Sequence, residues 1–96
     1  MEPSPLSDAK ARMAAEIDRR SALLLDVSHK IHAHPELNFE ERFAHELLTG
    51  VLEREGLQVT RSARGVETAF EATAGTSGPR VAVVCEYDAL PGIGHA

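Results

Sequence analysis

The sequence predicts an α/β fold in which two helices are followed by about three strands. Three observations support this. Apolar residues first recur at helical intervals of three, four or seven. Past about residue 56 the period changes to an alternating one, which is typical of half-buried strands. A continuous apolar run, Val81–Cys85, then indicates a strand covered on both faces of a sheet.

The first helix is expected from residue 8 to about Ala33. Residues 1–7 are expected to form a flexible leader, because prolines at positions 3 and 5 oppose a continuing helix. Ser7 can cap the helix, and Asp8 suits the positive end of its dipole. Pro35 ends the helix, since proline disfavours the α conformation in the residue before it. The apolar stripe consists of Met13, Ile17, Leu24, Val27 and Ile31.

A second helix is expected from about Asn38 to a glycine terminator at Gly56. Asn38 and Glu41 form a variant of the capping box that begins many helices. His45 is expected at the surface of this helix. The helix also has a broad apolar stripe suited to packing on a sheet. Its members are Phe43, Ala44, Leu47, Leu48, Val51 and Leu52.

Alternating residues over 57–61 and 66–72 predict two half-buried strands joined through residues 62–65. Glycine, serine and proline make residues 75–79 a turn. The covered strand, Val81–Cys85, follows. Within it Cys85 is expected to be a small buried hydrophobic residue rather than a nucleophile.

Composition limits the function classes. Ninety-six residues are enough for one small domain. Fifteen acidic residues against ten basic ones give a net charge of −5 without a basic stripe, which disfavours nucleic-acid binding. The apolar runs are far shorter than the ~20 residues needed to cross a bilayer, so no membrane partner is expected. A single cysteine is compatible with a cytoplasmic location.

Asp88 is the main candidate for a functional residue. It follows the covered strand, and ligand sites in open α/β sheets lie beyond the carboxyl ends of strands. The alternative is that Asp88 caps the turn into the next element. Glu86, two residues earlier, would share a face with Asp88 on a regular strand. The two carboxylates could bind a hard cation or divide acid and base roles, or Glu86 could be an exposed edge residue, which we favour.

Histidines near the end of the first helix do not form a recognised metal motif. His29, His32 and His34 lie close together in sequence, but no Cys-x-x-Cys or His-Glu-x-x-His pattern accompanies them. A solvated helix end is the preferred interpretation. Residues 92–94, Gly-Ile-Gly, are too short for a dinucleotide-binding loop, so no cofactor-binding residue is assigned.

Two segments nevertheless resemble a known family. Residues 31–41, IHAHPELNFEE, resemble the opening signature of the zinc-dependent aminoacylase and carboxypeptidase G-type amidohydrolases. Residues 86–96, EYDALPGIGHA, resemble the strand-end motif of that family. Their sequence is most similar to the motif of the branch that acts on aminobenzoyl-glutamate and related dipeptides. The likeness runs from about Ile17 to Ala96, with both motifs in the order the family requires.

The resemblance implies a two-metal hydrolase domain with a mixed sheet, flanking helices and a smaller lid inserted later. It implies zinc or manganese as the divalent metal of the intact enzyme, and a small amide or dipeptide as its substrate. Asp88 matches the family aspartate that orients the metal site. Glu86 stands where several branches have a metal-binding histidine, so no ligand role is assigned to it.

In this branch the pattern continues past His-Ala into Cys-Gly-His, with the general base and further ligands much later. Residues 8–96 are therefore expected to be the truncated N-terminal part of the catalytic domain, without the lid. Whether this chain is an enzyme stays open; we expect it to bind no metal and to be inactive alone. The alternative is a non-catalytic interaction module derived from the same fold. The exposed sheet edge of the truncated chain is expected to favour self-association.

Overall fold

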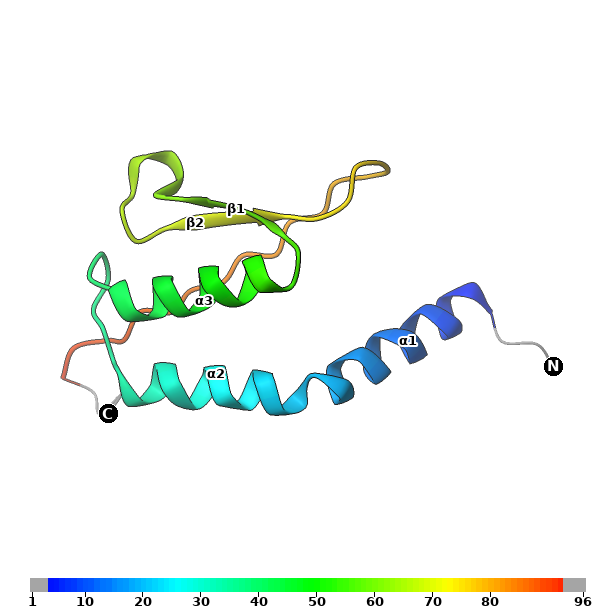
Figure 1. The fold of residues 1–96 in the computed structure, drawn as a ribbon, viewed down its shortest axis with the longest axis horizontal. Helices are drawn as coiled ribbons and strands as arrows, with labels where there is room; N and C mark the ends of the chain where they lie inside the picture. Colours follow the sequence, from blue (N-terminus) through cyan, green and yellow to red (C-terminus); the bar gives the residue numbers. More distant parts are fainter. Residues whose placement is uncertain (1–3, 93–96) are drawn as a thin grey trace.

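The computed structural model describes residues 4–92 and confirms the α/β class. The elements, in chain order, are α1 (Pro5–Arg19), α2 (Ser21–Ala33), α3 (Arg42–Arg54), β1 (Gln58–Arg61), the short 3-10 helix η1 (Ala63–Gly65) and β2 (Phe70–Thr73). Helix α3 lies between α2 and the β1–β2 hairpin, whereas α1 extends away from these layers (Figure 1). The molecule therefore measures 54 Å along its longest axis but only 29 Å and 23 Å along the others.

The expected first helix is in fact two helices, α1 and α2, which meet at Arg20. It also starts earlier than predicted: α1 begins at Pro5, and the Ser4 hydroxyl accepts a hydrogen bond from the Ser7 backbone N–H at 3.1 Å. Proline suits this first turn, where its missing N–H would have no helical partner anyway. The expected leader of residues 1–7 was thus wrong for residues 5–7, and residues 1–3 lie outside the described range.

The predicted break after the first helical region is confirmed, because residues 34–41 are not helical. Helix α3, however, begins at Arg42 rather than at Asn38. Asn38 does not cap it; the side chain of Glu36 does, as described below. The C-terminal end agrees with the prediction, since Gly56 follows α3 with a φ of 92°, in the left-handed region that favours glycine.

The best-packed part of the molecule lies between α3 and the hairpin. Ala44 and Thr49 are 1% and 0% exposed, and His45 is 8% exposed. The surface position expected for His45 was therefore wrong. His45 and Thr49 are four residues apart and lie on the same face of α3, which meets the hairpin. The His45 ring makes an edge contact with Phe70 of β2, with ring centres 6.0 Å apart.

Polar contacts join α3 to β1. The Thr49 hydroxyl donates to the His45 carbonyl at 2.7 Å and accepts a hydrogen bond from the Arg61 guanidinium at 3.1 Å. Arg61 also pairs with the Glu53 carboxylate at 2.6 Å. The helix and the hairpin are thus connected both by packing and by a polar network between α3 and β1.

The two alternating segments form an antiparallel hairpin in which Gln58 is opposite Thr73 and Arg61 is opposite Phe70. The second strand starts at Phe70 rather than near residue 66. The chain before it turns through η1, with Ser62 and Arg64 at positive φ angles of 52° and 54°. Four-residue strands with one half-buried face agree with the expected alternation.

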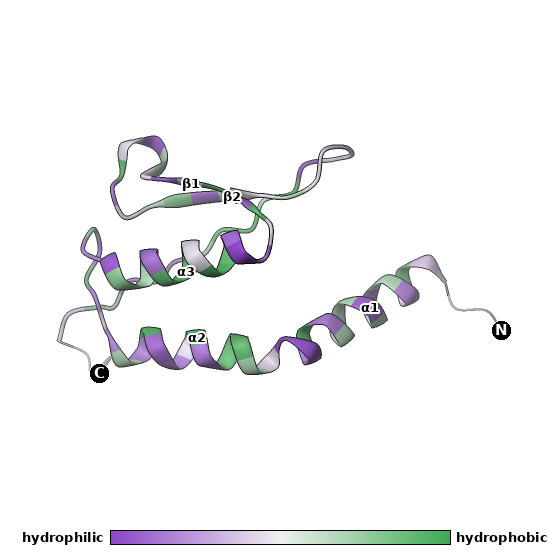
Figure 2. Ribbon diagram, in the orientation of Figure 1, coloured by the Kyte–Doolittle hydropathy of each residue, from purple (hydrophilic) through white to green (hydrophobic). Residues whose placement is uncertain are grey.

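The predicted covered strand, Val81–Cys85, is not a strand in the described residues. Val81, Val83 and Val84 are 84–88% exposed, and Cys85 is exposed too, so its expected burial was wrong. A strand covered on both faces needs neighbouring strands and helices. Within residues 4–92 the only sheet is the β1–β2 hairpin. Figure 2 shows the apolar and polar residues along the ribbon.

Candidate functional site

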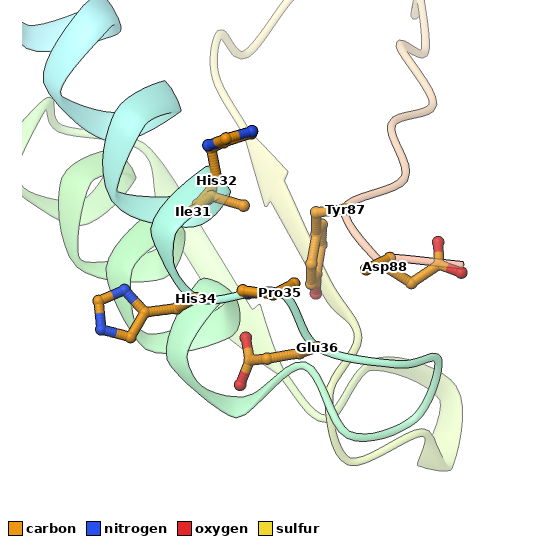
Figure 3. A pocket seen from close by; sticks show the side chains of 8 residues that line it. Ile31, His32, His34, Pro35, Glu36, Tyr87 and Asp88 are labelled. Carbon is orange, nitrogen blue, oxygen red and sulfur yellow. The ribbon is translucent and has the colours of Figure 1, made fainter. Parts of the chain in front are cut away.

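The two motifs of the sequence meet in space. The loop after α2 lies beside the segment that contains Asp88, and the Ala89 backbone N–H donates to the Glu36 carbonyl at 2.7 Å. Together they border an open concavity of about 310 Å³ (Figure 3). Its lining consists of Ile31, His32, His34, Pro35, Glu36, Tyr87, Asp88 and Ala89. Residues more than fifty positions apart in the sequence therefore form one site.

Glu36 organises the loop side of this concavity. Its carboxylate accepts hydrogen bonds from the backbone N–H groups of Phe43 at 2.8 Å and Ala44 at 3.0 Å. These N–H groups lie in the first turn of α3, where a helix leaves donors unpaired and its dipole favours negative charge. Sequence reasoning missed this role, because capping signals are sought next to the helix and Glu36 is six residues before Arg42.

Tyr87 anchors the other side of the site. Its hydroxyl donates to the Thr68 carbonyl, and its ring stacks on Phe70 with centres 6.0 Å apart. Burial raises the pKa of the Tyr87 phenol, and the carboxylates of Glu41 and Glu36 raise it further. Both causes disfavour the phenolate, so Tyr87 stays a hydrogen-bond donor. Tyr87 belongs to the strand-end motif, but the sequence pattern alone does not indicate this anchoring role.

Asp88 is half-buried and lies at the edge of two hollows. The second hollow, of about 390 Å³, is bordered also by Glu41 and Glu86. Figure 3 shows the Asp88 carboxylate directed away from His32, His34 and Glu36. Glu86 is exposed, as favoured from the sequence, and the chain around it is not a regular strand. The two carboxylates thus border the same hollow, but without the strand geometry that would place them on one face.

The histidines near the end of α2 do not converge with Asp88. His29, His32 and His34 are exposed. His34 has a structural contact instead: its ring stacks on Phe43 with centres 4.0 Å apart, and its Nδ1 atom is 2.9 Å from the Lys30 carbonyl oxygen.

Within residues 4–92, no three histidine, cysteine, aspartate or glutamate side chains are grouped so that they could hold a metal ion. The described part of the site therefore does not fit a metal by itself. His95 of the strand-end motif lies outside the described residues. None of the described helices is long and apolar enough to cross a membrane.

Comparison with known proteins confirms the resemblance seen in the two motifs, although no family model matches the chain. The chain is 40% identical to the human Xaa-Arg dipeptidase over 97% of its own length and 24% of the relative. The mouse Xaa-Arg dipeptidase is 39% identical over 91% of the chain and 22% of the relative. One of the subunits of the Escherichia coli p-aminobenzoyl-glutamate hydrolase is 40% identical over 83% of the chain and 16% of the relative.

The chain belongs to the amidohydrolase family that contains these dipeptidases and the p-aminobenzoyl-glutamate hydrolase. It is thus related to hydrolases. It spans about a quarter or less of the length of the relatives it matches.

Proposed function

We propose that the chain forms the N-terminal part of the catalytic domain of a metal-dependent amidohydrolase, and that the complete protein hydrolyses an amide or dipeptide bond in a small substrate. The supporting observation is the identity of about 40% to an Xaa-Arg dipeptidase over nearly the whole chain. The relatives' names describe hydrolysis of a dipeptide and of p-aminobenzoyl-glutamate. A cytoplasmic location is part of the proposal, because the chain has a single cysteine.

The role proposed for this chain is to build one wall of the active site. Asp88 lies at the edge of the concavity where the two family motifs meet. Because residues 4–92 do not group three ligands, the ligands of the proposed zinc or manganese ion are expected from sequence outside this range. For the same reason the 96-residue chain is proposed to be inactive alone.

In the first experiment, the coding sequence downstream of codon 96 is determined. We expect an open frame that continues into Cys-Gly-His. The complete product is then purified and assayed with an Xaa-Arg dipeptide and with p-aminobenzoyl-glutamate, before and after chelation and after addition of zinc or manganese. Turnover that chelation abolishes and metal restores is expected. Turnover that survives chelation would contradict metal dependence, and no turnover at all would contradict the hydrolase proposal.

A variant tests Asp88 in the complete protein. Asp88→Asn should lower kcat at least about tenfold, since partners that orient metal ligands typically contribute 10–100-fold. Asp26→Asn is the matched control, because Asp26 is on α2, is paired with Lys30 at 2.8 Å and is not among the residues that line the concavity. Equal kcat values for the two variants would show that Asp88 has no role in the active site.

The isolated 96-residue chain is assayed in parallel with zinc, manganese or cobalt added. No product above a metal-only blank is expected. Turnover by this chain would show that it is catalytically complete. A stop codon directly after residue 96, together with stable expression of the short chain, would instead favour the alternative of a non-catalytic interaction module.

A further inference from the structure

The chain between β2 and Tyr87 is exposed to solvent. Residues 74–86 are exposed and contain no regular secondary structure. Burial resumes abruptly at residues 87–89: Tyr87 and Asp88 are half-buried and Ala89 is 8% exposed. Specific contacts therefore begin where the candidate functional residue lies.

The contact before Asp88 is made by Tyr87. Its hydroxyl donates to the Thr68 carbonyl while its ring stacks on Phe70. Thr68 is itself only 4% exposed, and its hydroxyl lies 3.4 Å from Glu41 Oε1, to which it donates. Tyr87 is thus attached to a buried point of the hairpin region that is in turn connected to the start of α3.

The contact after Asp88 is made by Ala89. Its backbone N–H donates to the Glu36 carbonyl at 2.7 Å. Glu36 cannot shift freely, because its carboxylate accepts the N–H groups of Phe43 and Ala44 in the first turn of α3. The side chain of Glu36 therefore fixes the position of its own carbonyl, and through it that of Ala89.

We propose that Tyr87 and Glu36 are positioning residues that hold the backbone of Asp88 between two fixed points. Movement of Asp88 would break the Tyr87–Thr68 contact on one side or the Ala89–Glu36 contact on the other. The consequence for catalysis rests on the proposed function, whereas the two-point attachment does not. Precise placement matters at such a site, because a displacement of about 1 Å can cost a hundredfold in rate.

The attachment is tested on the 96-residue chain at low micromolar concentration by hydrogen exchange and mass spectrometry. Tyr87→Phe removes the hydroxyl and keeps the ring. Thr76→Val is the matched control, since it removes one hydroxyl from the exposed 75–79 turn. In Tyr87→Phe, exchange in the peptide that contains Ala89 should accelerate about threefold to tenfold, the net effect of one hydrogen bond. Equal exchange in wild type, Tyr87→Phe and Thr76→Val would overturn the attachment.

Glu36→Gln provides a second variant, since the amide keeps one acceptor oxygen and loses the charge. It should accelerate exchange in the same peptide, and at Phe43 and Ala44 as well. Acceleration confined to Phe43 and Ala44 would show that Glu36 only caps α3, which would overturn its positioning role.

Positioning of Asp88 is tested on the complete protein with the dipeptide substrate. Tyr87→Phe should lower kcat about tenfold with KM little changed, and Thr76→Val should change neither. An unchanged kcat, or an equal loss through KM alone, would overturn the positioning role. If the wild-type complete protein turns over neither substrate, the proposed function fails, and the exchange measurements alone decide whether the attachment exists.

Discussion

Tyr87 is an unusually convenient probe, because the chain contains one tyrosine and no tryptophan. Phenolate absorbance therefore reports this residue alone. Burial, followed by the charges of Glu41 and Glu36, raises its pKa. The folded chain consequently retains the phenol proton at pH values where the unfolded chain has lost it. This contribution to stability is complete below about pH 10, the ordinary tyrosine pKa, and is lost as pH rises through the folded value.

Spectrophotometric titration should accordingly give a midpoint above that of free tyrosine. Glu41→Gln should lower the midpoint, because it removes one of the negative charges that disfavour the phenolate. Glu71→Gln is the control, since Glu71 is paired with Arg64 and is not one of the charges that raise this pKa. An ordinary midpoint, or equal shifts in both variants, would contradict the structure around Tyr87.

His45 is the second informative residue. It is buried, and its Nε2 atom has no hydrogen-bond partner among the described residues. An unsatisfied buried polar atom lowers the free energy of unfolding by about 1–3 kcal/mol, whereas an edge contact such as that with Phe70 raises it by about 0.5–1.5 kcal/mol. His45→Leu should therefore stabilise the chain by about 1 kcal/mol in urea denaturation. His32→Leu, at an exposed position, should change stability little; destabilisation by His45→Leu would mean that Nε2 has a partner.

Among the elements, α3 has the central position, because it contacts α2 on one side and the hairpin on the other (Figure 1). Its start depends on a carboxylate from outside the helix. Ion pairs on the exposed surface, such as Arg42 with Glu67, contribute little by comparison.

Glu36→Ala should shorten α3 and destabilise it by about 1–2 kcal/mol, the usual cost of losing a helix cap. Circular dichroism and hydrogen exchange at Phe43 and Ala44 measure the loss. Glu40→Ala is the control from the same loop, since the capping hydrogen bonds come from Glu36. Equal effects of the two substitutions would show that charge near the helix, rather than the specific cap, is responsible.

For the molecule as a whole, exposed apolar surface is the dominant feature. Val81, Val83 and Val84 lie in an exposed, irregular segment outside the hairpin. Such a segment offers unpaired backbone groups and apolar side chains to another chain. Small domains also bury little surface, so cooperativity should be weak. We expect concentration-dependent self-association and a broad thermal transition.

Val83→Lys should reduce this association in sedimentation velocity, because a charge within an exposed apolar segment opposes edge-to-edge pairing with another chain. Thr76→Lys adds the same charge in the neighbouring turn and should have a smaller effect. A monodisperse wild-type monomer with a sharp, reversible transition above about 60 °C, high for a mesophilic domain, would contradict the prediction.

The helical regions, the break at Pro35, the end of α3 at Gly56 and the alternating strands could all be predicted from local patterns. These features depend on neighbours in the chain: a proline ring, a glycine at positive φ, a periodic stripe. The family could be predicted as well, because its two motifs are contiguous stretches of sequence.

Features that depend on distant contacts could not be predicted in this way. Burial of His45, capping by Glu36 and attachment of Tyr87 each join residues from different elements. The exposure of Val81–Cys85 has the same origin. An apolar run indicates that a strand can be covered, but covering it requires neighbouring strands that the local sequence does not specify. The sequence by itself thus determined the helical regions, the two hairpin strands and the family, and the tertiary structure alone decided which side chains meet around Asp88.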